Sequence, residues 1–326
     1  MFTIKDVAER AGVSIATVSR IMNKPDVVSE KTQKKVYKVM EELNYQPNAM
    51  ARALQQKKSN IIGLVLPMID YAFFSRLTDA IEEECHSYGY KLMLCKSGEH
   101  EEREKEMFSI LQANKVDGIL VCSRLGDASL FTNFDFPVVS IEREIEKVPS
   151  VTSDNYQGGS IAAQELIAAG CRVPAVFGAE VPDYFPGTKR IQGFRDEYAK
   201  IGLEIKECLA NKEAIGHKGL EDIFYEYIKN NTDIDGLFIM GDMMAAQILS
   251  SERAYKMDIK NKIPIVSFDG FEISEWMQLS TVVQPIREVG ECAVELLVRK
   301  IEGKVAPERS VLPVKLIKRE STKKFK

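Results

Sequence analysis

Acidic, basic and aromatic side chains follow several short apolar runs of this sequence. The set that we expect to bind a ligand comprises Asp70, Phe73, Phe74, Glu142, Arg190, Asp242 and Asp269. Carboxylate and guanidinium groups hydrogen-bond hydroxyls, and aromatic rings stack on the faces of sugars. Each residue alone has a plainer explanation, since Asp242 can cap a helix, Phe73 and Phe74 can be core, and Arg190 can form a surface ion pair. Their shared position after predicted strands favours a sugar site.

The sequence does not favour catalysis. It contains no phosphate-binding G-x-x-x-x-G-K-[ST] loop, no G-x-S-x-G motif and no plausible histidine triad. The three histidines and six cysteines are scattered, without metal-ligand spacing or a C-x-x-C pair. We therefore expect no catalytic residue, no metal and no cofactor, and reduced thiols in a cytoplasmic protein.

A second group of polar and basic residues lies near the start of the chain. Residues 1–60 hold 11 Lys or Arg and 6 Asp or Glu, a net charge of +5, whereas the remainder carries −9. A basic head on an acidic body is typical of a nucleic-acid-binding module joined to another domain. The set expected to contact DNA comprises Thr3, Ser14, Ile15, Ala16, Thr17, Ser19, Arg20, Asn23, Asn48, Arg52 and Leu54.

Three short helices must position the first members of this DNA-contacting set. Residues 3–11 form the first, with Thr3 and Asp6 as a capping box, and the second runs from Ile15 to about Met22 after a turn at Gly12. A third begins after Ser29. The pattern is a helix-turn-helix in which Arg20 of the second helix reads a guanine edge or a phosphate in the major groove. A small capped three-helix bundle without DNA is the alternative.

The segment after the third helix reads YQPNAMARAL. Pro47 ends the third helix and Asn48 can cap a two-turn helix rich in alanine, which is marginal alone in water. Leu54 can act as an apolar wedge in a minor groove. A plain linker helix is the alternative, and we treat residues 1–46 as the DNA-binding domain and 47–60 as hinge and linker.

From residue 61 the pattern changes to apolar runs that alternate with amphipathic helices. The predicted strands are 61–67, 90–95, 116–123, 137–142, 173–179, 235–241 and 263–270. Such alternation predicts parallel sheets covered on both faces, here in two lobes with the ligand site between them. We expect the first lobe to comprise residues 61–157 and 287–319, and the second 158–286, within a domain of residues 61–326.

Length and composition fit this division. The chain has 326 residues, 45% of them hydrophobic and 28% charged, as expected for folded domains with ample cores. No apolar run approaches the ~18 residues of a membrane span, and the start lacks the apolar segment of a secretory signal. We expect a cytoplasmic protein that binds no membrane.

The first 55 residues resemble the DNA-binding head and hinge of the lactose/galactose repressor (LacI/GalR) family. The matching stretches are TIKDVAERAGVSIATVSRIMN and VSEKTQKKVYKVMEELNYQPNAMARAL. This resemblance implies that Ile15, Ala16 and Arg20 occupy the main operator-reading positions and that Leu54 intercalates at the operator centre. Because Ile15 and Ala16 are apolar, they can read little more than a thymine methyl.

The body resembles the same family less strictly. The motifs P-x-I-x-x-x-FF, S-x-DN-x-x-GG, R-x-x-GF, FDG and L-x-T-V-x-QP are similar to its regulatory domain, which has a periplasmic sugar-binding-protein fold. The resemblance implies that Arg190 anchors the effector, that Asp269 binds it and that Glu142 contacts the sugar. Where the family often has a polar residue before Asp242, this chain has Gly241, so the same hydroxyl contact is not expected. Several details resemble sucrose-operon and related saccharide repressors.

These observations predict a transcriptional repressor of a carbohydrate-utilisation operon. A mono- or disaccharide bound between the lobes would release it from operator DNA, and a tail without leucine heptads favours a homodimer. The alternative is a catabolite-control-type global regulator with a protein or sugar-phosphate corepressor. An enzyme and a transport receptor fit the sequence less well.

Overall fold

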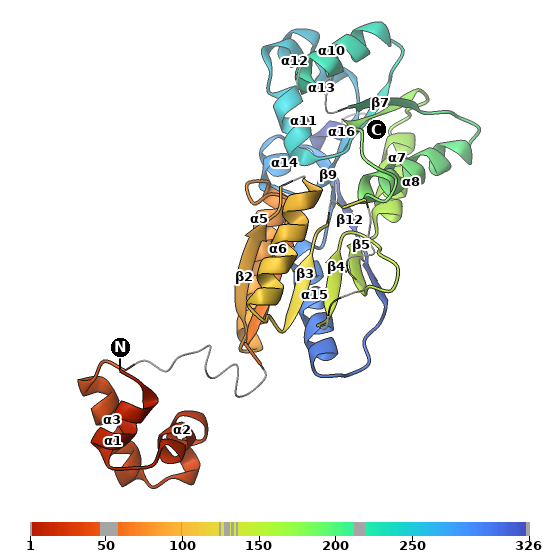
Figure 1. Ribbon diagram of the computed structural model, residues 1–326. Coiled ribbons are helices and arrows are strands. Elements are labelled where there is room, and N and C mark those ends of the chain that lie inside the picture. Colours follow the sequence, from red (N-terminus) through yellow and green to blue (C-terminus); the bar gives the residue numbers. More distant parts are fainter. Residues whose placement is uncertain are drawn as a thin grey trace. The chain divides into compact units, whose positions relative to one another are not determined.

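The computed structural model describes residues 2–45, 58–98, 100–123, 125–126, 131, 134, 136–211 and 219–323 (Figure 1). The chain forms two compact units, residues 1–59 and 60–326. Within the described residues, no helix is both long and apolar enough to cross a membrane. The same residues contain no cluster of three or more His, Cys, Asp or Glu side chains that could hold a metal ion.

The first unit is the three-helix head expected from the sequence. Its elements are α1 (Ile4–Ala11), α2 (Ile15–Asn23), the 3-10 helix η1 (Pro25–Val27) and α3 (Glu30–Glu42). The backbone N–H and hydroxyl of Thr3 both donate to Asp6 Oδ2, at 2.7 and 2.8 Å, which closes the predicted capping box. Gly12 ends α1 with φ 61°, the left-handed conformation that glycine adopts without a side-chain clash. The core comprises Val7, Ala8, Ala11, Val18, Ile21, Val36, Val39 and Leu43.

The second unit contains two six-stranded sheets. The first has the order β11-β5-β4-β3-β1-β2 and is parallel throughout. Its strands are β1 (Ile61–Leu66), β2 (Lys91–Lys96), β3 (Gly118–Val121), β4 (Val138–Ile141), β5 (Ser150–Ser153) and β11 (Arg309–Leu312). The second has the order β12-β10-β9-β8-β6-β7. Its strands are β6 (Pro174–Ala179), β7 (Lys206–Ala210), β8 (Gly236–Ile239), β9 (Ile265–Asp269), β10 (Ser280–Val283) and β12 (Lys315–Ile317).

Helices cover both faces of each sheet, as parallel strands require. Those of the first lobe are α5 (Ala72–Ser87), α6 (Glu101–Ala113) and α15 (Ile286–Ile301). Those of the second are α7 (Asn155–Ala168), α8 (Pro186–Ala199), α10 (Leu220–Asn230), α11 (Asp242–Leu249), α12 (Glu252–Met257), α13 (Ile259–Lys262), α14 (Glu272–Trp276) and α16 (Glu320–Lys323). Neighbouring strand residues alternate between two cores, as Leu64 and Val65 do in the first lobe and Val176 and Phe177 in the second.

The chain crosses between the lobes at three points in its described part, after β5, after β10 and after β11 (Figure 1). One boundary differs from the sequence prediction, which assigned residues 287–319 to the first lobe. Residues 315–317 instead form β12, which pairs antiparallel with β10 of the second sheet. The apolar side chains of Val314 and Leu316 explain the difference, because both pack into the core of the second lobe.

Candidate functional site

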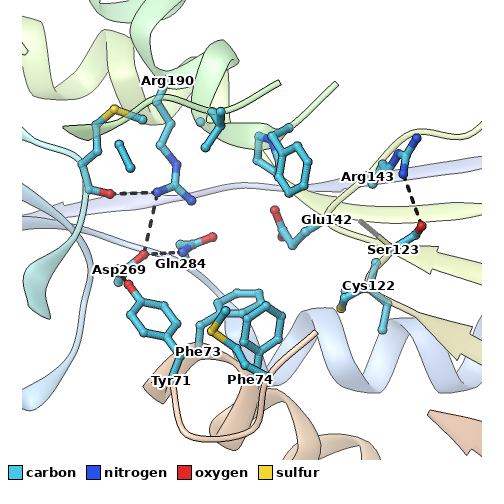
Figure 2. A pocket seen from close by; sticks show the side chains of 18 of the residues that line it. Tyr71, Phe73, Phe74, Cys122, Ser123, Glu142, Arg143, Arg190, Asp269 and Gln284 are labelled. Carbon is cyan, nitrogen blue, oxygen red and sulfur yellow. Dashed lines mark hydrogen bonds and ion pairs between the residues drawn. The ribbon is translucent and has the colours of Figure 1, made fainter. Parts of the chain in front are cut away.

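A cavity of about 350 Å³ lies between the two lobes. Its lining comes from residues at or after the carboxyl ends of β1, β3 and β4 in the first lobe and of β6, β8, β9 and β10 in the second, where ligands bind in open parallel sheets. Its volume is in the usual range for small-molecule sites. Figure 2 shows polar groups at two ends of the cavity and the aromatic rings of Phe73 and Phe74 along one side.

Arg190, on α8, supplies a buried cation at one end of this cavity. Its Nε donates to Asn155 Oδ1 at 2.7 Å and its Nη1 donates to the carbonyl oxygen of Met240 at 3.1 Å. The same Nη1 lies 3.8 Å from Asp269 Oδ1, and the guanidinium stacks 3.7 Å from the ring centroid of Phe268. Burial lowers the pKa of the guanidinium, against the opposing effect of the nearby carboxylates. These contacts hold the arginine in one orientation.

The close approach of α7 and α8 sets the position of Arg190. A Cβ atom at Gly159 would lie 1.9 Å from the carbonyl oxygen of Arg190, and one at Gly193 would lie 2.0 Å from that of Tyr156. Only glycine at both positions lets the two helix backbones touch. The GG and R-x-x-GF motifs of the sequence therefore have a structural role, which is to bring the arginine to the cavity.

Asp269, at the end of β9, is the carboxylate that faces Arg190. Its Oδ1 accepts a hydrogen bond from Gln284 Nε2 at 2.7 Å, and its Oδ2 accepts one from the Tyr71 hydroxyl at 3.1 Å. Burial raises the pKa of this carboxyl to about 7, although the Arg190 charge acts in the opposite direction. The backbone of Asp269 has φ 112°, a strained conformation of the kind that clusters at functional sites.

Glu142 follows β4 and lines the cavity between the groups around Arg190 and the Arg143–Ser123 pair (Figure 2). Its Oε1 accepts hydrogen bonds from the N–H and hydroxyl of Ser153, at 2.7 and 2.8 Å, and its Oε2 accepts one from Asn155 Nδ2 at 3.1 Å. Burial raises the pKa of its carboxyl, whereas these hydrogen bonds lower it. Asn155 thus connects Glu142 and Arg190, because it donates to one and accepts from the other.

Phe73 and Phe74 lie in the first turn of α5 and line the same cavity. Their ring centroids are 5.3 Å apart and the rings are nearly perpendicular. Because both side chains are less than a tenth exposed, they also belong to the core of the first lobe. Of the seven residues proposed from the sequence as ligand contacts, these two, Glu142, Arg190 and Asp269 come together here.

Asp70 and Asp242 do not join the cavity. Asp70 is exposed on the loop after β1 and is absent from the cavity lining. Asp242 is fully buried, and its oxygens accept from the hydroxyls of Ser267 and Thr281 and from the N–H groups of Gly270 and Phe271. It therefore holds the turn that follows β9, and we withdraw both aspartates from the expected ligand contacts.

Four further polar residues of the cavity were not among the expected contacts: Tyr71, Ser123, Arg143 and Gln284. Tyr71 comes from the loop that precedes α5, and Gln284 follows β10 within the QP motif. The Oε1 atom of Gln284 is buried and has no hydrogen-bond partner among the described residues. A ligand hydroxyl can donate to it. The QP motif was the available signal for Gln284, whereas an isolated tyrosine in a loop offers none.

The second helix of the head presents the residues expected to contact DNA. Ser14, Ile15, Ala16 and Arg20 are exposed, whereas Val18 on the inner face is buried. Ile15 is 45% exposed and lies at the start of this helix. Such a surface is what a recognition helix needs.

Other members of the predicted DNA-contacting set are less accessible or lie outside the described part. Thr17 and Ser19 are half-buried, and Ser14 Oγ accepts from the Thr17 backbone N–H at 3.1 Å. Thr3 is exposed and bonded to Asp6. The side chain of Asn23, and all of Asn48, Arg52 and Leu54, lie outside the described residues. Their roles stay predictions.

Two family models match this chain. The periplasmic binding proteins and sugar binding domain of the LacI family matches residues 59–320, and the bacterial regulatory proteins, lacI family, matches residues 3–48. The sucrose operon repressor of Streptococcus mutans serotype c is 33% identical over 98% of this chain and 98% of its own length. The ribose operon repressor of Halalkalibacterium halodurans is 33% identical over 99% of this chain and 98% of its own.

Solved structures agree with these matches. A periplasmic binding protein/LacI transcriptional regulator from Alkaliphilus metalliredigens QYMF, complexed with D-xylulofuranose, has a TM-score of 0.71 and 32% identity, over 81% of this chain and 99% of that one. The lac repressor dimer bound to operator and the anti-inducer ONPF has a TM-score of 0.84 and 25% identity, over 98% and 99%. The fold and the resemblance inferred from the sequence are confirmed, and the chain belongs to the LacI family of bacterial regulatory proteins.

Proposed function

We propose that this protein is a sequence-specific repressor of a carbohydrate-utilisation operon, and that a small sugar bound between its lobes releases it from operator DNA. The observation that carries the proposal is the cavity, which is lined by two arginines, two carboxylates and an amide, with two aromatic rings along one side. The names of the relatives support it, because several are repressors of sucrose or ribose operons.

Within the cavity, we assign the sugar ring to the space beside Phe73 and Phe74. Hydroxyls on one side of the ring face Arg190 and Gln284, and those on the other side face Glu142 (Figure 2). Arginine donates only, glutamate and the Gln284 oxygen accept, and a hydroxyl can do both. This combination suits a neutral polyhydroxyl ligand and needs no cofactor.

The head supplies the DNA-binding half of the proposal. Two copies of α2, one from each chain of a homodimer, would read the half-sites of a pseudopalindromic operator, with Arg20 contacting bases or phosphates. The dimeric solved relative bound to operator supports this assembly. A repressor of this kind acts on the chromosome, so we place it in the cytoplasm and assign it no enzymatic activity.

The test is a thermal-shift screen of the full-length protein against mono- and disaccharides and their phosphates, since a ligand that binds the folded state raises its unfolding temperature. The sugar that raises it should also weaken operator binding. By thermodynamic linkage, operator DNA should weaken sugar binding by the same factor. A sugar that binds but leaves operator affinity unchanged would contradict the proposed regulation.

A further inference from the structure

The hydroxyl of Tyr71 connects the two lobes through Asp269. Tyr71 precedes α5 of the first lobe, Asp269 ends β9 of the second, and the hydroxyl donates to Oδ2 at 3.1 Å (Figure 2). The tyrosine ring packs edge-on against Phe271, with the centroids 6.2 Å apart, and is tilted against Phe74 at 6.4 Å. The phenol is therefore held in place by aromatic contacts with both lobes.

Gly241 lies beside this hydroxyl and beside the Asp269 carboxylate. A Cβ atom at Gly241 would lie 3.4 Å from the Tyr71 oxygen and 3.4 Å from Asp269 Oδ2. The backbone there is extended, with φ −168°, so the conformation itself would accept any residue. Without a side chain at this position, the region beside Oδ2 is open to a group from the opposite lobe.

The Asp269 carboxylate is nearly closed off from the cavity. Its side chain is 4% exposed although it lines the cavity. On Oδ1 the neighbours are Gln284 and Arg190, both rooted in the second lobe. Tyr71 bonds the other oxygen, Oδ2, and it belongs to the first lobe. Because the carboxylate is so little exposed, a sugar hydroxyl can bond Oδ2 only if the phenol moves away from it.

We propose that Tyr71 is a latch between the lobes that competes with the sugar for Asp269. In the sugar-free protein the phenol holds the cleft closed, and a sugar hydroxyl that takes Oδ2 displaces it. The competition rests on the proposed sugar-binding function, but the latch itself does not. The exposed Arg76–Glu272 and Lys189–Glu144 ion pairs also join the two lobes, but solvent-exposed pairs contribute little. The Asn155–Glu142 hydrogen bond lies beside the connection from β5 to α7, so we assign the latch to the buried hydrogen bond between Tyr71 and Asp269.

The latch can be tested without any sugar through Cys122, which lines the cavity and is 7% exposed. Alkylation of full-length protein with iodoacetamide at pH 8, read by peptide mass mapping, reports how often the cleft opens. Tyr71→Phe removes one hydrogen bond to a carboxylate, so the rate at Cys122 should rise about tenfold. The core thiols of Cys85 and Cys171 should stay unlabelled if the variant is folded.

Tyr156→Phe is the matched control. The Tyr156 hydroxyl also donates to an aspartate, Asp196 Oδ2 at 2.9 Å, but both residues lie on the second lobe and are away from this cavity. The control should leave the rate at Cys122 unchanged. An unchanged rate in Tyr71→Phe with its core thiols protected overturns the latch.

Sugar titration tests the competition. D-xylulose, D-ribose and sucrose are titrated calorimetrically into wild type, Tyr71→Phe and Tyr156→Phe. A sugar that binds wild type should bind Tyr71→Phe about tenfold more tightly, because the protein no longer has to give up a bond. Equal or weaker binding overturns the competition. If none of the three sugars binds wild type or either variant, these sugars are not the effector. The alkylation experiment, which uses no sugar, still tests the latch.

Discussion

The DNA-reading head and the ligand-binding body place their functional residues in opposite ways. In the head, Ser14, Ile15 and Arg20 lie on the exposed face of one helix, within seven residues of sequence. In the body, Tyr71 and Asp269 are 198 residues apart and meet at the cavity between the lobes. A surface that reads a large rigid partner needs only local order, whereas a cavity that encloses a small ligand needs the whole fold. Changes in the body should therefore affect stability and binding together, and changes at the head surface should affect binding alone.

The largest effect is expected from Arg190→Ala. Removing one partner of a buried charge pair costs about 3–5 kcal/mol, because the remaining carboxylate stays buried without its cation. We expect a lower unfolding temperature and the loss of sugar binding in calorimetry, while operator binding persists and no longer responds to sugar. Lys189→Ala is the control, since this neighbouring lysine forms an exposed ion pair with Glu144. If sugar still bound Arg190→Ala and still weakened its operator binding as in wild type, the proposed sugar site would be wrong.

Gly193→Ala should destabilise the body by about 3 kcal/mol, the upper range for an overpacked core. Glycine to alanine inside a helix ordinarily stabilises by about 1 kcal/mol, so the sign itself is informative. The reason is the contact of the new Cβ with the Tyr156 carbonyl. Chemical unfolding measures the effect. Gly187→Ala, whose nearest neighbour would be the flexible end of Met240, should stay near wild type.

Arg20→Ala should weaken operator binding by about 1–3 kcal/mol, the usual worth of one specific base contact. The measurement is fluorescence anisotropy on the duplex that wild type selects from a random library. Sugar binding and the unfolding temperature of the body should not change, since Arg20 is an exposed side chain of the head. An Arg20→Ala protein that selects the same duplex with equal affinity would remove this residue from the reading surface.

The two regions should also differ in their response to pH. Burial raises the pKa of the Asp269 carboxyl from 3.8 to about 7, so the folded protein keeps this proton up to a higher pH than the unfolded chain does. The free energy of unfolding of the body should therefore fall as the pH rises from about 4 to 7 and stay constant at higher pH. In the head, hydrogen bonds from Thr3 lower the pKa of Asp6, which gives the opposite slope.

Thermal unfolding between pH 3 and 8 checks this prediction, with the effect of Asp6 below about pH 4 and that of Asp269 above it. Asp269→Asn should flatten the slope, because the amide does not titrate. The pKa values of Glu142 and Asp242 are also raised by burial, so part of the slope should remain. If Asp269→Asn left the slope as in wild type, the carboxyl would not be the titrating group.

Much of the fold could be predicted from local pattern, and the exceptions have local causes. The capping box at Thr3 and the alternating strands and helices of the body were expected and are present. Residues 242–255 have the pattern of one continuous helix but form two, because Ser251 caps the second. The strand at 315–317 is three residues long, too short for its pattern to indicate a sheet. The hinge prediction lies outside the described residues.

By itself the sequence determined the two-part organisation, the three-helix head with its proposed DNA-reading helix, and the presence of carboxylates and an arginine after strands. Those features depend on periodicity and caps, which act over a few residues. Only the tertiary structure decided which carboxylates line the cavity. Asp242 and Asp269 both stand where a strand ends, yet one is bonded inside the protein and the other faces Arg190. The direction of each side chain depends on strand register and on the packing of the two lobes, and the residues next to it in the sequence determine neither.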